Sequence, residues 1–411
     1  MRYLRWLHLP MLALALTTAA HAQTNFDTYR VARMDEVVGP NIVISDVNAQ
    51  GEMVGSQRLD SGQIRAVLVR DGMVINLDDL MGGASPHTNA VAINDFAQVA
   101  GISVIQDASG NLVGPAVLWE GGQIRDLGIS GIVTDLNNRG QVIGDTQVVG
   151  ETDRPFLWEN GRTTFLELLM DCLPFTIAHA LAINDNGVIV GEVNFRAVMW
   201  RNGEVMPLGP IEPKTTSRAV DVNDRDEVIV NFHFFDHQEP GDITEVKTAV
   251  LLHDGGEIFL PPDRAESASA VSINNNSQVV GHSSVHGNQG GPRFDRATIW
   301  QEGRVATLDE LISDDDPRKG LLTLTFATKI FDSGLIIARG EDGASYFLTP
   351  TGVPATVAQP PAPLPSSPDN GSGGGADSGG GSVDLLSVLF LMLGLARFAR
   401  SRRRHCVGAF G

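Results

Sequence analysis

The segment Ala90-Val-Ala-Ile-Asn-Asp-Phe-Ala-Gln-Val-Ala-Gly101 decides the fold, because the chain repeats it at intervals. Ala180–Gly191 and Ala270–Gly281 are close copies, with an Ile-Asn pair and a final glycine at the same positions. Looser copies occupy Val43–Gly55, Val133–Gly144, Ala219–Asn231 and Thr328–Gly340. Self-similarity of this kind indicates a repeat architecture, in which each copy builds one supersecondary unit.

One asparagine stands at the same place in six copies, and Phe331 replaces it in the seventh. These repeat asparagines are Asn48, Asn94, Asn137, Asn184, Asn223 and Asn274. Alternating apolar residues precede each one, a turn signal begins with it, and a β-branched run follows, which predicts two strands joined by a tight turn. Asparagine suits such a turn because its side chain can bond the backbone two residues further on and because it tolerates left-handed geometry.

Each copy continues into a second half such as Ala116-Val-Leu-Trp-Glu-Gly-Gly-Gln-Ile-Arg-Asp-Leu-Gly128, which predicts a further hairpin. A tryptophan recurs at one strand position, and we expect it to be a packing anchor rather than a sugar-stacking platform. The four tryptophans are Trp119, Trp158, Trp200 and Trp300. Four short strands at a spacing of about 40–50 residues are typical of a β-propeller blade.

The two ends of the repeat region predict a closed ring. The seventh copy stops after Pro350 without a fourth strand, and Tyr29–Met34 offers an unpaired strand before the first copy. Pairing the two would protect the sheet edges. The sequence therefore predicts an all-β, seven-bladed β-propeller over residues 23–352, with four antiparallel strands in each blade and closure by the N-terminal strand. An open β-solenoid or two smaller β domains are the alternatives.

These repeats resemble the HAF repeat, a family of repeats predicted to be extracellular. The pattern is Ala-x-x-Ile-Asn-x-x-Gly-x-Val-x-Gly, followed by His-Ala-Phe-x-Trp and Asp-Leu-Gly. One full copy matches it at Asn94, Gly101, Trp119, Asp126, Leu127 and Gly128. The His-Ala-Phe motif itself is eroded, since its positions read Pro115-Ala-Val, Arg196-Ala-Val and Arg296-Ala-Thr. The resemblance implies an extracellular location and no established reaction.

Residues 1–22 are typical of a signal peptide. Arg2 and Arg5 precede an apolar run from Leu9 to Leu16, and the segment ends in small residues at Ala20 and Ala22, which signal peptidase reads. We therefore expect export and a mature chain that begins at Gln23.

The opposite end has three parts. Residues 353–382 form a linker, rich first in proline and then in glycine and serine, and are expected to be flexible. Residues 383–404 join an apolar stretch, predicted to be a hydrophobic helix, to an arginine cluster, and residues 405–411 form a short tail. The apolar stretch is short for a membrane span of about twenty residues.

The order of glycine run, short apolar helix and basic tail resembles the GlyGly-CTERM sorting signal. Its glycine run is Gly379-Gly380-Gly381-Ser382. The resemblance implies transient membrane anchoring, cleavage near the glycines by a rhomboid-type sorting protease, and delivery to the surface or medium of a Gram-negative cell. The alternative is a periplasmic protein that stays on the inner membrane through this helix.

Charge excludes two classes of main partner. The chain carries 30 basic and 49 acidic side chains, a net charge of −19. Removal of Met1–Ala22 and Ser382–Gly411 leaves 23 basic and 48 acidic side chains, a net charge of −25. Such a chain repels nucleic acid and anionic lipid.

Insertions predict one plain and one elaborated face. In a four-stranded meander the turns after strands one and three share a face, and here they are short. The long connections belong to the opposite face, which also holds Asp314, Asp315 and Asp316. Because function gathers where insertions gather, we expect an acidic binding face there.

Site motifs are few. His233, Asp236 and His237 are candidate metal ligands in the longest insertion. Asp221–Glu227 superficially resembles a calcium loop, but it lacks the central glycine and final glutamate of an EF-hand, so no cofactor is predicted and calcium is the alternative. Ser283 lies in a near miss to Gly-x-Ser-x-Gly and is interpreted as a strand residue.

The favoured function is therefore a secreted or cell-surface, non-catalytic binding propeller with an unknown extracellular ligand. The alternative is an extracellular hydrolase or lyase that acts on a polymer, with its acid and base drawn from carboxylates or from His233, His237 and His282.

Overall fold

The computed structural model describes residues 26–77, 87–106, 112–146, 154–169, 177–209, 215–235, 243–251, 255–261, 267–287 and 291–355. Internal contacts divide the chain into two units, Met1–Pro360 and Pro361–Gly411, and every described residue lies in the first. These residues form β-strands and one short helix, α1 (Met34–Val38), which confirms the predicted all-β class. None of the described residues belongs to a helix with the length and apolar character that a membrane crossing requires.

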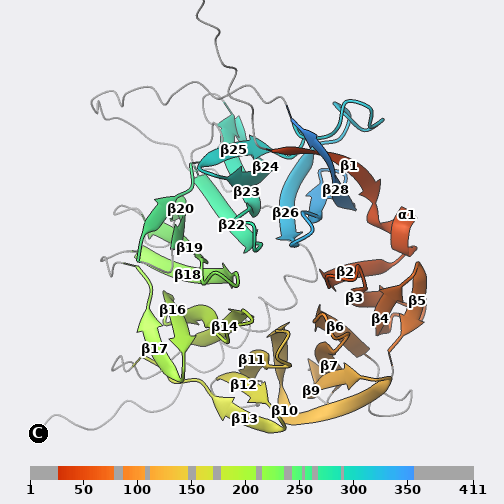
Figure 1. Cartoon of the computed structure of the whole chain (residues 1–411), viewed down its shortest axis with the longest axis vertical. Helices are drawn as coiled ribbons and strands as arrows, with labels where there is room; N and C mark the ends of the chain where they lie inside the picture. The colour runs from red at the N-terminus through yellow and green to blue at the C-terminus, as the bar shows by residue number, and fades with distance from the viewer. Residues whose placement is uncertain are drawn as a thin grey trace, which may run out of the picture. The chain divides into compact units, whose positions relative to one another are not determined.

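Four sheets contain four antiparallel strands each, and Figure 1 shows the sheets following one another in chain order. The first of these sheets contains β14 (Ala178–Ile183), β15 (Ile189–Val193), β16 (Arg196–Arg201) and β17 (Glu204–Pro207). The second contains β18 (Thr215–Val222), β19 (Val228–Phe235), β20 (Ile243–Leu251) and β21 (Glu257–Phe259). The third contains β22 (Ser267–Ile273), β23 (Val279–Gly287), β24 (Gly291–Gln301) and β25 (Arg304–Thr307). The fourth contains β26 (Leu324–Ile330), β27 (Ile336–Gly340), β28 (Ser345–Pro354) and the N-terminal β1 (Asp27–Arg33).

The remaining strands form one twelve-stranded sheet where the sequence predicts three separate sheets. Its strands are β2 (Ile42–Val47), β3 (Met53–Arg58), β4 (Ile64–Arg70), β5 (Met73–Asn76), β6 (His87–Ile93), β7 (Val99–Gln106), β8 (Leu112–Val113), β9 (Pro115–Glu120), β10 (Gln123–Leu136), β11 (Val142–Thr146), β12 (Pro155–Glu159) and β13 (Arg162–Phe165). The first half of β10 pairs with β9 and the second half with β11, and a register shift between Asp126 and Ser130 separates the two halves. A single parallel bridge, Ile64 to His87, joins β4 to β6.

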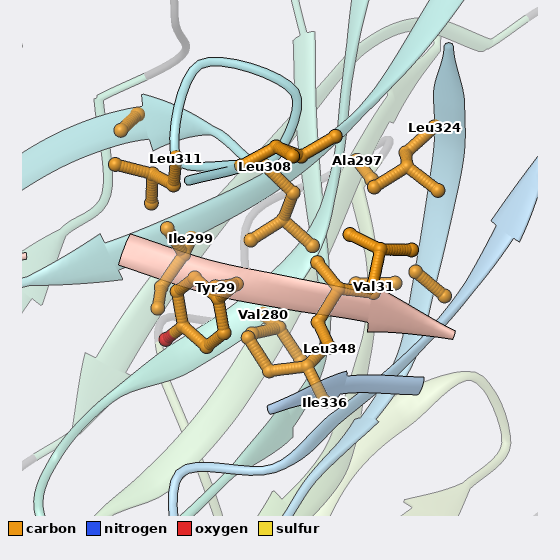
Figure 2. Packing of buried hydrophobic residues seen from close by; sticks show 14 of the residues in the cluster. Tyr29, Val31, Val280, Ala297, Ile299, Leu308, Leu311, Leu324, Ile336 and Leu348 are labelled. Carbon is orange, nitrogen blue, oxygen red and sulfur yellow. The ribbon is translucent and has the colours of Figure 1, made fainter. Parts of the chain in front are cut away.

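The N-terminal strand takes the outer position of the last sheet. β1 pairs antiparallel with β28, with Val31 opposite Leu348. Figure 2 shows Tyr29 and Val31 of β1 packed into an apolar cluster with Leu348 and Leu311, and Tyr29 retains 1% of its accessible surface. The expected strand ends one residue early, because Met34 begins α1.

The insertion before β26 covers the other edge of β1. The amide of Tyr29 donates to the carbonyl of Leu311 at 2.8 Å, and the amide of Ser313 donates to the carbonyl of Tyr29 at 2.9 Å. The amide of Val31 donates to Asp316 Oδ2 at 2.8 Å. This insertion was expected to be a loop of the binding face, but part of it caps a strand edge that would otherwise expose unpaired backbone groups.

A β-bulge recurs in the first strand of every copy, just before the repeat asparagine or, in the seventh copy, before Phe331. The bulge brings the backbone close to the second strand. A Cβ at Gly191 would lie 1.9 Å from the carbonyl oxygen of His179, and one at Gly101 would lie 2.0 Å from that of Asn89. In five copies a glycine permits this close approach, whereas Val230 and Ala338 stand at the same position in the fifth and seventh copies.

Candidate functional site

The repeat asparagines close the turns between the first and second strands. Asn94 is typical, since its Oδ1 accepts from the amides of Phe96 at 3.1 Å and Gln98 at 3.0 Å. The left-handed residue is the fourth of the turn rather than the asparagine itself, and at Ala97 its φ is 56°. The side chain therefore replaces backbone hydrogen bonds that the tight turn leaves unmade.

The same side chain also reaches the neighbouring copy. Nδ2 of Asn94 donates to the carbonyl of Asn137, and Nδ2 of Asn137 donates to that of Asn184. The donation is repeated from Asn48 through to Asn274, which donates to the carbonyl of Phe331, at distances between 2.8 and 3.2 Å. We call this series the asparagine ladder. It fixes each turn to the next and uses hydrogen bonds that the sequence pattern within one copy does not predict.

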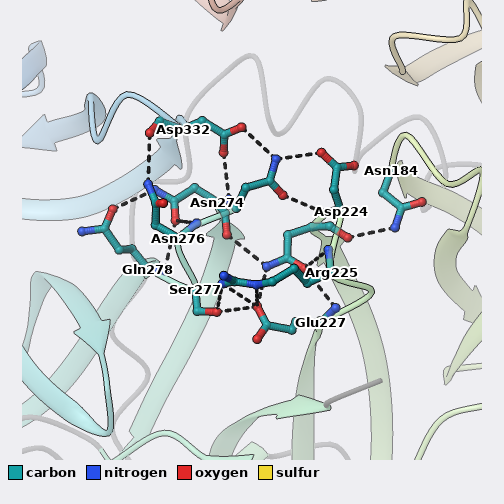
Figure 3. A network of polar contacts seen from close by, with 11 residues as sticks. Asn184, Asp224, Arg225, Glu227, Asn274, Asn276, Ser277, Gln278 and Asp332 are labelled. Atoms are coloured by element: carbon teal, nitrogen blue, oxygen red, sulfur yellow. Dashed lines mark hydrogen bonds and ion pairs between the residues drawn. The ribbon is translucent and has the colours of Figure 1, made fainter. Parts of the chain in front are cut away.

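A second series runs beside the asparagine ladder through the residue after each repeat position. The amide of Asp224 donates to Asn275 Oδ1 at 2.7 Å, and the amide of Asn275 donates to Asp332 Oδ1 at 2.8 Å. The same bond joins the earlier copies in the order Ala49, Asp95, Asn138, Asp185 and Asp224. Figure 3 shows the part of both series that runs from Asn184 to Asp332.

Both series end at the seventh copy. Phe331 has no amide group to donate, and Ala49 of the first copy has no side-chain oxygen to accept. We call the contact between the seventh copy and the first copy the seam. Phe331 lies there in a buried apolar cluster with Met34, Val38, Ile44 and Phe347. The seam therefore replaces directional bonds by apolar burial.

Two residues before the repeat position, aspartate alternates with small residues. This position reads Asp46, Ala92, Asp135, Ala182, Asp221, Ser272 and Lys329 in the seven copies. Asp135 accepts from the amide of Leu136 in its own copy at 2.8 Å and from the amide of Ile183 in the next copy at 2.9 Å. One aspartate thus accepts hydrogen bonds from two copies, which explains why the following copy has no aspartate at this position.

The three aspartates and Lys329 form a cluster of opposite charges, which we call the charge cluster. Lys329 Nζ lies 3.9 Å from Asp46 Oδ1, and the lysine side chain keeps 37% of its accessible surface. Burial raises the pKa of Asp135 to about 7 and also raises the pKa of Asp46 and of Asp221. Burial opposes the charge of Lys329, but the three carboxylates outweigh it and raise the pKa of the ammonium group.

The proposed metal ligands are only partly within the structure. His233 lies half-buried in β19, and burial, with a smaller contribution from Arg218, lowers the pKa of its imidazole. Asp236 and His237 lie outside the described residues. Within the described ranges, no three His, Cys, Asp or Glu side chains converge closely enough to hold one metal ion.

The carboxylates of the calcium-like segment take part in the turn network. Asp226 accepts from Asn184 at 2.6 Å and from Arg201 at 2.7 Å. Glu227 accepts from Asn223 and from Ser277. Because these acceptors bond to different copies, their geometry is that of a structural network rather than of a shared ion site.

At the other end of the strands, charged pairs bridge neighbouring sheets. His179 Nδ1 lies 2.8 Å from Asp145 Oδ2, and the hydrogen bond to this carboxylate raises the pKa of the imidazole. Arg218 Nε lies 3.6 Å from Glu192. Sequence reasoning missed these pairs, although each joins the eighth residue after one repeat asparagine to the fifth residue before the next.

Other candidate residues have packing positions. The four repeat tryptophans retain between 1% and 4% of their accessible surface, and Nε1 of Trp200 donates to the carbonyl of Glu167 at 2.6 Å. Ser283 retains 1% and pairs within β23 opposite Ala268, so it is a strand residue as interpreted. The ring of His282 packs edge-on against Phe326 at a centroid distance of 4.7 Å. The processing residues Ala20, Ala22, Gly379, Gly380, Gly381 and Ser382 lie outside the described residues.

The three aspartates of the expected acidic face have different contacts. Asp316 is buried and accepts from the backbone of Val31 and Arg318, so it supports the fold. Asp315 pairs with Arg30, and Asp314 is exposed 3.9 Å from Lys319. The insertion therefore contributes less free acidic surface than its sequence predicts.

No protein-family model and no curated protein matches the chain. Among solved structures, a Mycobacterium tuberculosis puromycin-hydrolyzing peptidase is 13% identical, with a TM-score of 0.45, over 84% of this chain and 57% of its own. The β-propeller domain of the Trilobed protease from Pyrococcus furiosus is 10% identical, with a TM-score of 0.47, over 76% of this chain and 94% of its own. YCF48 bound to D1 peptide is 12% identical, with a TM-score of 0.45, over 81% of this chain and 99% of its own. The likenesses concern architecture and carry no ligand or reaction to this chain.

Proposed function

We propose that this protein is a closed seven-bladed β-propeller that binds a partner, without catalysis, through the face opposite the asparagine ladder. Three observations support seven blades. The repeat position occurs seven times, the asparagine ladder passes through all seven turns in chain order, and β1 supplies the outer strand of the last sheet. Dividing β10 at the register shift after Asp126 resolves the twelve-stranded sheet into three groups of four, with the two-residue β8 outside them.

The single observation that carries the binding role is the difference between the two faces. On the ladder face, the polar groups of the turns bond to one another across copies, so few of them are available to a ligand. Within the described residues, the opposite face holds the insertion between β25 and β26, the pairs Asp145–His179 and Glu192–Arg218, and a groove of about 500 Å³. Binding groups that rigid strands position in this way are typical of repeat folds.

The path of the chain supports the same assignment. Asp27 pairs with Pro354, and the amide of Ala355 donates to the carbonyl of Phe26 at 2.7 Å. β28 runs from the 341–344 turn towards the ladder face, so both ends of the described residues leave on that side. A tether that continues beyond residue 355 would therefore leave the opposite face accessible to a partner.

We also propose export through the signal peptide and release or surface display after cleavage near Gly379–Ser382. Mass spectrometry of the mature protein tests this proposal. A mature chain that begins at Gln23 and ends near Ser382 is the expected result. A chain that keeps its arginine cluster on the inner membrane would instead support a retained periplasmic protein.

One observation favours a second candidate, an extracellular polymer hydrolase or lyase. The Asp145–His179 pair has the arrangement of a carboxylate that orients a general base. A screen of extracellular polysaccharides and polypeptides with the wild-type protein and with His179→Gln tests it. Turnover by the wild-type protein that a folded His179→Gln variant lacks would favour the enzyme over the binding protein.

The binding proposal is tested on the exported protein with panels of glycans, peptides and divalent ions. We expect saturable binding of at least one class, reduced by substitutions on the opposite face such as Glu341→Gln and unaffected by Phe96→Ala on the ladder face, where Phe96 is 73% exposed. Binding that Phe96→Ala abolishes and Glu341→Gln spares would assign the ligand to the wrong face and overturn the proposal.

A further inference from the structure

A groove lies beside the N-terminal strand, on the face opposite the asparagine ladder. The insertion before β26 forms one wall, with Arg318, Leu321 and Leu322, and the turn between β27 and β28 forms the other, with Glu341 and Asp342. We call it the β1 groove, and its volume is about 500 Å³. Its two walls come from segments that the closure of the fold already holds in place.

Hydrogen bonds fix the second wall before any ligand arrives. The amide of Glu341 donates to the carbonyl of Thr323 at 3.0 Å and so joins the two walls. Asp342 accepts from the hydroxyl of Tyr346 at 2.7 Å and from the amide of Ala344 at 3.0 Å. Although burial opposes it, the Tyr346 hydrogen bond keeps the pKa of Asp342 below its ordinary value, so this carboxylate is ionised at neutral pH.

The charge of the β1 groove is negative. Arg318 is neutralised locally, because it donates to Glu36 at 2.8 Å and to the carbonyl of Val31 at 3.1 Å. Glu341 and Asp342, in contrast, form no ion pair with any residue that the structure describes. Arg33 is near enough to help lower the pKa of Asp342, but it forms no ion pair with that carboxylate. Two neighbouring carboxylates without an ion-paired cation favour a positively charged ligand group.

The same groove exposes apolar surface. Leu321 is 85% exposed, the largest exposed fraction among the large hydrophobic residues of the described part. Leu322 beside it is half-buried. A leucine that contributes little to the core, at the edge of a groove with an acidic wall, provides a place for an aliphatic chain to lose its contact with water.

We propose that the β1 groove binds a peptide segment through a lysine side chain, whose aliphatic stem lies over Leu321 and whose ammonium group lies between Glu341 and Asp342. This inference rests on the proposed function, since it names the ligand class of the binding face. A lysine matches both features of the groove, because its side chain combines a four-carbon stem with a compact charge. The net charge of −19 further favours encounter with basic partners.

The test uses the exported protein and a fluorescein-labelled nonapeptide of glycine, leucine and one central lysine. The control peptide carries Nε-acetyl-lysine, which keeps the stem and removes the charge. We expect saturable binding of the lysine peptide, at least tenfold weaker binding of the acetylated peptide, and loss of affinity at high salt, because the interaction is partly exposed to solvent.

Variants then locate the site. Glu341→Gln and Leu321→Ser should each weaken binding about threefold to tenfold, since each removes one half of the proposed contact. Glu257→Gln on the outer strand β21 makes the same change in net charge away from the groove and should leave affinity unchanged. Circular-dichroism melting curves show whether each variant remains folded, and Glu341→Gln is the decisive one because its side chain is exposed.

The outcomes separate this inference from the proposed function. Lysine-peptide binding that Glu341→Gln and Leu321→Ser leave unchanged would overturn the β1 groove as the site. Absence of lysine-peptide binding, together with a glycan or ion that still binds this face, would overturn the ligand class alone. Failure of every panel would overturn both.

Discussion

The ladder junctions and the seam hold neighbouring copies together by different chemistry. At the ladder junctions, each repeat asparagine donates to the next copy, and the following residue does the same through its amide. At the seam, Phe331 and Ala49 remove both bonds, and an apolar cluster takes their place. Hydrogen bonds demand a fixed register, whereas apolar burial is non-directional. The contrast indicates that the junction completed by distant parts of the chain uses the more tolerant interaction.

Phe331→Asn is the sharpest way to break this comparison, because it gives the seam the residue found in the other six copies. We expect a loss of about 3 kcal/mol in the free energy of unfolding, since a large buried side chain is removed and an amide is buried in an apolar cluster. Urea denaturation measures the change. Phe331→Leu is the control and should cost less than about 1.5 kcal/mol. Stabilisation by Phe331→Asn would show that the seam is an incomplete ladder rather than a distinct junction.

Asn184→Ala tests the ladder side. The variant loses donation to the carbonyl of Asn223 and leaves the amides of Asn186 and Val188 without their side-chain acceptor. We expect a loss of about 2–3 kcal/mol, because buried polar groups are left unsatisfied. Gln50→Ala, an exposed side chain in the first turn, should change stability by less than about 0.5 kcal/mol. Equal effects of the two substitutions on the urea midpoint would remove the energetic role assigned to the asparagine ladder.

Lys329→Met tests the charge cluster, which joins residues of the first, third, fifth and seventh copies. It leaves Asp46, Asp135 and Asp221 without their countercharge, and we expect a loss of about 2 kcal/mol at pH 8, less than for a fully buried pair because water reaches the lysine. A carboxyl group whose pKa is raised on folding binds protons more tightly when folded, so its contribution to stability falls as pH rises from about 4 to above about 7. The loss should therefore be smaller at pH 5. The same loss at both pH values would contradict the proposed charge balance.

Ala97→Gly probes a single ladder turn and has the smallest expected effect. Ala97 has a φ of 56°, a conformation that costs an alanine about 1 kcal/mol and a glycine almost nothing. We expect the free energy of unfolding, measured by thermal denaturation, to rise by about 0.5–1 kcal/mol. Ala49→Gly is the matched control, since Ala49 does not have a left-handed backbone, and it should lose a few tenths of a kcal/mol. A gain in the control alone would rule out strain at Ala97.

Much of the architecture could be predicted because its determinants are local. The turn bonds of Asn94 depend on residues two and four positions away, and the recurrence of that turn is visible in the sequence. The second bond of the same side chain depends on the neighbouring copy, about 40–50 residues away, so spacing within one copy gives no sign of it. A partial signal did exist in the alternation of aspartate and small residues at Asp46, Ala92 and Asp135.

The candidate site was harder to predict than the fold. Its groove depends on how one insertion folds against the N-terminal strand, a contact between residues nearly 300 positions apart in the chain. The acidic run Asp314–Asp316 was expected to face a ligand, yet Asp316 bonds to the amide of Val31 and Asp315 pairs with Arg30. Carboxylates that support backbone and carboxylates that bind ligands have the same sequence signature, and only their surroundings distinguish them.

The bond between Ala355 and Phe26 has a consequence for protein engineering. Because the two ends of the described region already touch, a linker of a few residues could join them, and new termini could be opened in a connection between two other sheets. Such a circular permutant would preserve the bonds between all copies except those beside the new cut. The order in which the copies are translated would change in such a permutant. The direction in which each repeat asparagine donates to its neighbour would not change, because the folded structure sets it.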